Sequence, residues 1–140
     1  MTADAAHNLT VPEEFTRTDL SAYVAERLGS IPKGPALLTG VQQANARGAH
    51  TGAVEVVATA GLSNPAVLPV RETPEERASD RSATHSGFDP GTVNIFVGST
   101  EPLTDGGLAG VLATAVEAKT ATLSAIAGCT GTTSDAIAVG

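Results

Sequence analysis

The chain has 140 residues, of which 41 % are hydrophobic, and this size suits one domain with a single hydrophobic core. Its formal net charge of −7 disfavours binding to nucleic acid or to an anionic membrane surface, because both need clustered positive charge. An acidic, lysine-poor composition fits a salt-rich cytoplasm and, equally well, the bias of a GC-rich genome.

The first part of the chain contains one predicted helix and one short predicted strand. Residues 1–17 are polar, and we expect a flexible lead-in there. Apolar residues at helical spacing then predict a helix that begins at its N-cap, Thr18, and ends at Gly29. The apolar run 36–41 predicts a strand, and the polar segment 42–52 predicts a connection with a helical turn.

Two β-branched runs, 53–62 and 92–98, predict the central strands. No helical pattern lies between them, so we expect them to pair as antiparallel neighbours. The end of the first strand then meets the start of the second, which brings Ser63 and Asn64 close to Thr92 and Asn94.

The last third of the chain predicts a helix followed by a strand. The helix runs from about 107 to 127, with Thr104 or Asp105 as its cap, and it ends at Gly128. Residues 136–139 form the last predicted strand. Because strand, helix and strand follow one another, we expect a parallel crossover.

These elements predict an α/β fold: a single domain with a small mixed sheet, an antiparallel strand pair and a long crossover helix. The domain is expected over residues 18–140. Within it, the charged and turn-rich stretch 71–89 is predicted to be a loop insertion.

Two polar residues interrupt apolar patterns. Asn94 lies in the middle of the second strand, where a buried amide without partners costs about 1–3 kcal/mol, and Lys119 lies in the apolar stripe of the long helix. Asn94 can satisfy the backbone of a nearby loop. Lys119 can extend to solvent or pair with Asp135 or Glu55. The alternative is a ligand site, in which Asn64, Asn94 and Lys119 meet at one rim of the sheet.

Other chemistry has weak support in the sequence. The three histidines lack the spacing of metal ligands, so we expect no metal site. The lone Cys129 excludes a disulfide framework, and we expect it to be an inert small residue. The N-terminus does not resemble a signal peptide, and no apolar run approaches the roughly 20 residues that span a bilayer. We therefore expect a cytoplasmic protein without membrane partners.

Several blocks, taken together and in order, resemble a known family. They read TAGLSNP (59–65), PGTVNIFV (90–97), EPLTDGGLAGVLATAVEAKTATL (101–123) and TGTTSDAIAV (130–139). This series is similar to the signature blocks of the adenosylcobinamide amidohydrolases, and ALLTGV (36–41) fits the segment that precedes them. The order and spacing of the blocks make the resemblance specific.

The resemblance implies a corrinoid-salvage hydrolase. Such an enzyme cleaves the amide between the aminopropanol arm and the propionyl side chain of adenosylcobinamide, giving adenosylcobyric acid. The corrinoid is then the substrate, and no resident cofactor is expected. The motifs, together with the strand pairing, nominate nine site residues: Lys119, Glu117 and Asp135 as catalytic residues, and Thr59, Ser63, Asn64, Thr92, Asn94 and Thr132 as substrate-binding residues.

Amide hydrolysis suggests roles for some of these residues. Lys119 would support the developing oxyanion, and Glu117 or Asp135 would act as the base. Asn64 and Asn94 would hold the scissile carboxamide or neighbouring amides of the corrin. Glu117 fits this scheme poorly, because the helical wheel turns it away from Lys119.

The chain also departs from the family pattern. It has the insertion 71–89, and the family usually carries further segments on both sides of the matched region. We therefore expect a truncated member. The alternatives to an active hydrolase are a non-catalytic corrinoid-binding module and an incomplete fragment that needs a partner or forms a homo-oligomer to cover its sheet edges.

Overall fold

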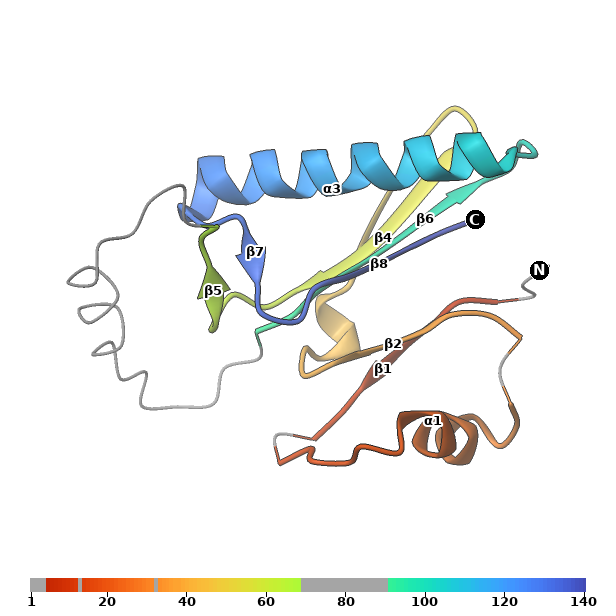
Figure 1. Cartoon of the computed structure of the whole chain (residues 1–140), viewed down its shortest axis with the longest axis vertical. Coiled ribbons are helices and arrows are strands. Elements are labelled where there is room, and N and C mark those ends of the chain that lie inside the picture. Colours follow the sequence, from red (N-terminus) through yellow and green to blue (C-terminus); the bar gives the residue numbers. More distant parts are fainter. Residues whose placement is uncertain (1–4, 13, 32, 69–90) are drawn as a thin grey trace.

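The computed structural model describes residues 5–12, 14–31, 33–68 and 91–140, so the predicted loop 71–89 lies outside the described residues. A four-stranded sheet forms the middle of the molecule, with the long helix α3 on one face and a smaller layer of β1, β2 and α1 on the other (Figure 1). This arrangement confirms the predicted single α/β domain with a mixed sheet.

The four-stranded sheet contains both predicted kinds of strand pairing. Its order is β3 (Arg47–Thr51), β4 (Val54–Ala60), β6 (Val93–Ser99) and β8 (Ala136–Val139). Strands β4 and β6 are antiparallel neighbours, whereas β6 and β8 are parallel. The predicted central pair and the predicted parallel crossover are therefore both confirmed.

Helix α3 (Asp105–Ala127) is the crossover between β6 and β8. Its N-cap is Thr104, whose Oγ1 accepts a hydrogen bond from the backbone N of Gly107 at 3.1 Å. Its C-cap, Gly128, has a φ of 66°, a conformation that glycine adopts without steric cost. Both ends of this helix agree with the predicted capping residues.

The smaller layer corrects two predictions. Strand β1 (His7–Thr10) lies within the segment expected to be a flexible lead-in, and it pairs in parallel with β2 (Ala36–Thr39). Helix α1 (Leu20–Leu28) connects the two strands, and its N-cap is Asp19 rather than Thr18. The sequence of β1 has a single large apolar residue, so pairing and hydrogen bonds, rather than an apolar pattern, place it.

The remaining elements are short. The 3-10 helix η1 (Gln43–Asn45) confirms the predicted helical turn. Edge strand β3 follows it and was not predicted, because it is exposed throughout and contains glycine and alanine in place of an apolar run. Strands β5 (Pro65–Ala66) and β7 (Gly131–Thr132) pair as a two-residue antiparallel ladder at one end of the sheet.

The core of the α3 face is small. Val93, Leu123 and Cys129 are buried against one another, and Ile95 packs against them. Cys129 is only 3 % exposed, which fits its expected role as a small core residue. Among the described helices, none has the length and hydrophobicity to cross a membrane.

A buried hydrogen-bond network connects the β1–β2 layer to the sheet. Asn94 has no solvent exposure, and its Nδ2 donates to the carbonyl oxygen of Leu38 at 3.0 Å and to Asn8 Oδ1 at 2.9 Å. Asn8 Nδ2 donates in turn to Thr59 Oγ1 at 3.0 Å. The amide in the middle of β6 therefore fastens one layer to the other.

The direction of this network fixes the orientation of the Asn94 amide. Thr10 Oγ1 donates to the carbonyl of Val41 at 3.0 Å, so it accepts from Gln43 Nε2 at 2.9 Å. Gln43 Oε1 then accepts from Asn8 Nδ2 at 3.3 Å, which leaves Asn8 Oδ1 to accept from Asn94. Asn94 Oδ1 consequently has no partner within the described residues, and Asn94 acts here as a donor.

We expect Asn94→Asp to lower the free energy of unfolding by at least about 2 kcal/mol, because a carboxylate cannot donate to Leu38 and would itself be buried. Urea denaturation measures the change. Asn45→Asp, at an exposed position of η1, is the matched control and should change stability by less than about 0.5 kcal/mol. Equal stabilities for both variants would contradict a structural role for Asn94.

Candidate active site

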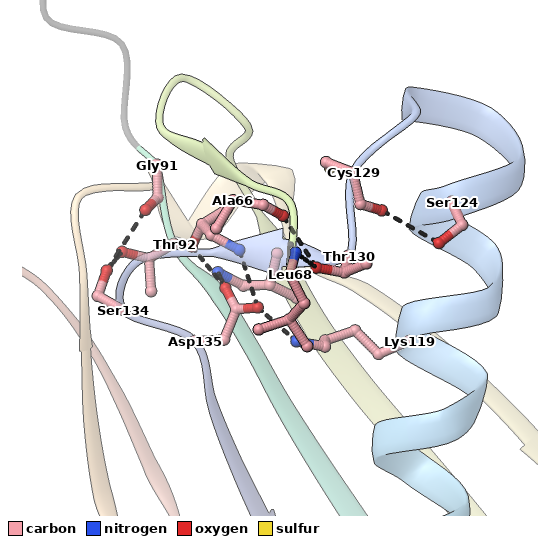
Figure 2. Close-up of polar contacts among 12 residues, drawn as sticks. Ala66, Leu68, Gly91, Thr92, Lys119, Ser124, Cys129, Thr130, Ser134 and Asp135 are labelled. Carbon is pink, nitrogen blue, oxygen red and sulfur yellow. Dashed lines mark hydrogen bonds and ion pairs between the residues drawn. The ribbon is translucent and has the colours of Figure 1, made fainter. Parts of the chain in front are cut away.

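One carboxylate gathers three elements at the end of the sheet. Asp135 Oδ1 accepts from the backbone N of Val93 at 3.0 Å and from Thr132 Oγ1 at 2.5 Å. Asp135 Oδ2 accepts from the backbone N of Thr132 at 3.1 Å and from Lys119 Nζ at 2.5 Å. Figure 2 shows Lys119 reaching from α3 to this carboxylate, which lies beside the start of β6.

The Lys119–Asp135 ion pair is largely shielded from water, with 13 % and 11 % of the two side chains exposed. Burial by itself raises the pKa of Asp135, but the hydrogen bonds from Lys119, Thr132 and Val93 outweigh it and hold that pKa below its usual value of 3.8. Asp135 is therefore a fixed carboxylate with four donors. This environment disfavours the predicted role of Asp135 as a general base.

A second polar group lies beside this pair. Asn64 Nδ2 donates to Thr133 Oγ1 at 3.1 Å, and Asn64 Oδ1 accepts from Ser63 Oγ at 3.0 Å. The hydroxyls of Thr92 and Ser134 lie 2.9 Å apart and share a hydrogen bond. The predicted proximity of the 63–64 segment to the start of β6 is thus confirmed.

The β5–β7 ladder holds this segment against the turn 130–135. Pro65 pairs with Thr132, and the backbone N and Oγ1 of Thr130 both donate to the carbonyl of Ala66, at 2.9 and 3.0 Å (Figure 2). Thr130 Oγ1 also accepts from the backbone N of Leu68 at 3.1 Å. These bonds fix the distance between the 63–64 segment and the Lys119–Asp135 pair.

Two glycines leave room for these side chains. A Cβ at Gly91 would lie 1.6 Å from Asn64 Oδ1 and 2.7 Å from the backbone N of the same residue. A Cβ at Gly131 would lie 2.5 Å from Asp135 Oδ2 and 2.8 Å from Lys119 Nζ. Both positions require close approach of a polar side chain to the backbone, which explains a glycine at each of them.

The structure separates two of the residues that were expected to meet. Lys119 lines the α3 face of the sheet together with Val93 and Ile95, whereas Asn94 points to the β1–β2 layer on the other face. Thr59 pairs with Asn94 across the strands and shares its network. The prediction that Asn64, Asn94 and Lys119 meet at one rim is therefore wrong, because successive side chains of a strand alternate between its faces.

The nine predicted residues thus divide into three groups. Six lie at the end of the sheet, two lie in the network of the other face, and Glu117 is exposed on α3. Those at the end of the sheet are Ser63, Asn64, Thr92, Lys119, Thr132 and Asp135.

Sequence reasoning missed several residues that build these groups. Ser134 was not singled out, although the turn that contains it is rich in polar residues. Asn8 and Gln43 gave no signal, because their partners are distant in sequence. In the described ranges, no three His, Cys, Asp or Glu side chains gather closely enough to hold a metal ion.

The arrangement can polarise a carbonyl group. Asp135 is the only hydrogen-bond partner of Lys119 Nζ within the described residues, and an ammonium has three donors. Two of its donors therefore remain for a ligand oxygen at the end of the sheet, where Asp135 holds the ammonium. A fixed cation next to a water-poor surface suits the stabilisation of a developing negative charge.

Gly91→Ala should displace the side chain of Asn64 and destabilise the protein by about 1–3 kcal/mol, since its Cβ would overlap both side-chain and backbone atoms. Gly98→Ala, in the strand β6 that follows Gly91, is the matched control, because a Cβ there meets no atom within 4 Å. Thermal unfolding of both variants measures the difference. Equal melting temperatures would refute the close approach.

Asp135 also predicts a dependence of stability on pH. Its pKa is lowered by folding, so its contribution is complete above the unfolded value near 3.8 and is lost as the pH falls through the lower folded value. Asp135→Asn should remove this component and flatten the decline of stability below about pH 4. Urea titrations between about pH 2 and 7 test this, and parallel profiles for the two proteins would contradict it.

The chain as a whole is similar in sequence to a known family of enzymes. The chain matches the family described as adenosylcobinamide amidohydrolase over residues 1–140. A protein of Halobacterium salinarum named adenosylcobinamide amidohydrolase is 45 % identical over 142 residues, covering 98 % of this chain and 59 % of the relative. The chain thus spans less than two thirds of that relative's length, and no solved structure matches it. The match over the full chain and the identity to this relative show that the protein belongs to the adenosylcobinamide amidohydrolase family.

Proposed function

We propose that this chain hydrolyses the amide that joins the aminopropanol arm to the propionyl side chain of adenosylcobinamide. The products are adenosylcobyric acid and aminopropanol, and the acid can return to cobalamin synthesis. The observation that carries the proposal is the family match over residues 1–140. The Lys119–Asp135 pair at the end of the sheet supports the proposal, because it holds an ammonium in a fixed position that a substrate carbonyl could use.

Lys119 is the residue we assign to the oxyanion. During hydrolysis, water adds to the carbonyl carbon, the carbonyl oxygen gains negative charge, and the C–N bond breaks as the leaving amine takes up a proton. A preorganised donor at that oxygen stabilises the transition state more than the ground state. Asp135 holds the ammonium in place through Oδ2 and is a positioning residue.

Asn64 is the residue we assign to a substrate carboxamide. A side-chain amide has two N–H donors and two acceptor lone pairs. Its bonds with Thr133 and Ser63 use one donor and one acceptor, and they fix the orientation of the amide. One N–H and one lone pair of Asn64 remain. The N–H can donate to the C=O of a substrate carboxamide, and the lone pair can accept from its N–H. The exposed position of Asn64 lets a large substrate reach them.

The other predicted roles change accordingly. Asn94 and Thr59 are assigned to the joint between the two layers, since both are buried on the face away from Lys119. Neither predicted base gains support: Asp135 is saturated with donors, and Glu117 is exposed on α3. The proposal therefore assigns no general base.

Incubation of the purified chain with adenosylcobinamide tests the proposal directly. We expect adenosylcobyric acid and free aminopropanol in equal amounts, separated and identified by liquid chromatography and mass spectrometry. Corrinoid binding without cleavage would reject the hydrolase and favour the corrinoid-binding module. Neither binding nor cleavage would reject both functions for this chain.

Lys119→Met should lower kcat by about 100-fold or more, which is the usual cost of removing one oxyanion donor. Lys33→Met, which changes the chain's other lysine, is the matched control and should keep wild-type turnover. Circular dichroism and the melting temperature report whether each variant folds. Retained turnover with a large drop in melting temperature would instead identify Lys119 as a purely structural ion-pair partner.

A further inference from the structure

Helix α3 has no polar face. It has 23 residues, and only Asp105, Glu117 and Lys119 are charged. Leu123 is the one buried residue of the helix, while large side chains such as Ile126, 75 % exposed, remain open to solvent. A helix that is apolar on all sides is normally covered on all sides. Within the described residues, helix α3 therefore lacks part of its cover.

The part of the chain that the structure describes covers only half of the sheet beneath helix α3. Four strands about 4.8 Å apart span roughly 15–20 Å, which is the width of two helices packed about 10 Å apart. Helix α3 contacts mainly β8 and β7, whereas β3 is exposed throughout. A groove of about 710 Å³ runs between α3 and the β4–β6 strands. The vacant half of this face has room for one more helix.

The dimensions of the groove match α3 itself. Its lining extends along α3 from Gly107 to Ile126, roughly 30 Å at 1.5 Å per residue. Of the described helices, α1 has nine residues and is too short to fill it, while α3 has 23. Small side chains such as Gly110 and Ala118 line the groove and allow close helix packing.

The charges of the two surfaces are complementary. Arg47 pairs with Ala58 in the sheet, which places its Cβ on the same face as Val54, on the edge strand β3 next to the groove. Its Nη1 donates to the carbonyl oxygens of Ala44 and Ala46. Glu117 is exposed on α3. A twofold axis that brings α3 of one copy onto the vacant half of the other sheet would bring these opposite charges together twice, because each copy contributes both residues.

We propose that a second copy of this chain covers the groove, so that two α3 helices lie side by side between two sheets. Each sheet is then covered by its own α3 and by that of the partner. This isologous arrangement explains both the uniform apolar character of α3 and the half-covered sheet. It does not depend on the proposed enzymatic activity.

Two valines of one strand provide a matched test. Val54 lines the groove and is 37 % exposed, whereas Val57 is 45 % exposed on the opposite face of β4. Sedimentation velocity of the wild-type chain should show a dimer. Val54→Asp should raise the dimer Kd at least about tenfold, and Val57→Asp should leave it within about twofold. A wild-type monomer, or equal effects of the two substitutions, would overturn the proposal.

A charge exchange tests the orientation of the second copy. Arg47→Glu and Glu117→Arg should each weaken the dimer, because each places like charges together. The double variant restores opposite charges in both pairs and should recover a Kd within about threefold of the wild type. Additive losses in the double variant would overturn this interface. The folded state of each variant is followed by circular dichroism, which a loss of the dimer alone should not alter.

Discussion

The geometry of the site depends on one carboxylate. Asp135 accepts hydrogen bonds from the first residue of β6, from the backbone and hydroxyl of Thr132, and from Lys119 on α3. Hydrogen bonds to a charged group contribute about 1.5–3 kcal/mol each, roughly twice as much as neutral ones. Because these donors belong to separate segments, the carboxylate fixes their relative positions. The location of the Lys119 ammonium follows from that convergence.

Strand β6 connects this site to the rest of the fold by presenting different groups to its two sides. Val93 buries its side chain in the α3 core, and its backbone N binds Asp135. The next residue, Asn94, points through the sheet and donates to Leu38 and Asn8. Two adjacent residues thus anchor the helix side and the β1–β2 side. A shift of register by one residue would exchange these environments and break both anchors.

The sequence predicted those parts of the molecule whose signal is local. The β-branched runs and the capping residues Thr104 and Gly128 each leave a pattern in one continuous stretch of sequence, and the order of these elements predicted the crossover. The ion pair of Lys119 with Asp135 was one of the explanations that the sequence offered for Lys119. Strand β1 is different, because its place depends on bonds to residues some 30 to 90 positions away. The face to which Asn94 points depends on strand register, which composition does not encode. We therefore predicted one shared site for Asn94 and Lys119, although the two side chains lie on opposite faces of the sheet.

The stability of the fold does not by itself account for the Lys119–Asp135 pair. Removing two charges from water offsets most of their attraction, so apolar residues of similar size commonly replace such pairs without loss of stability. The surroundings favour that replacement, because the Lys119 side chain lies among Val93, Ile95 and Leu123. Asp135 could also accept the hydrogen bonds from the backbone N of Val93 and of Thr132 without a lysine beside it. A lysine at this position has a cost, and in the proposed function the binding of a carbonyl oxygen would offset that cost.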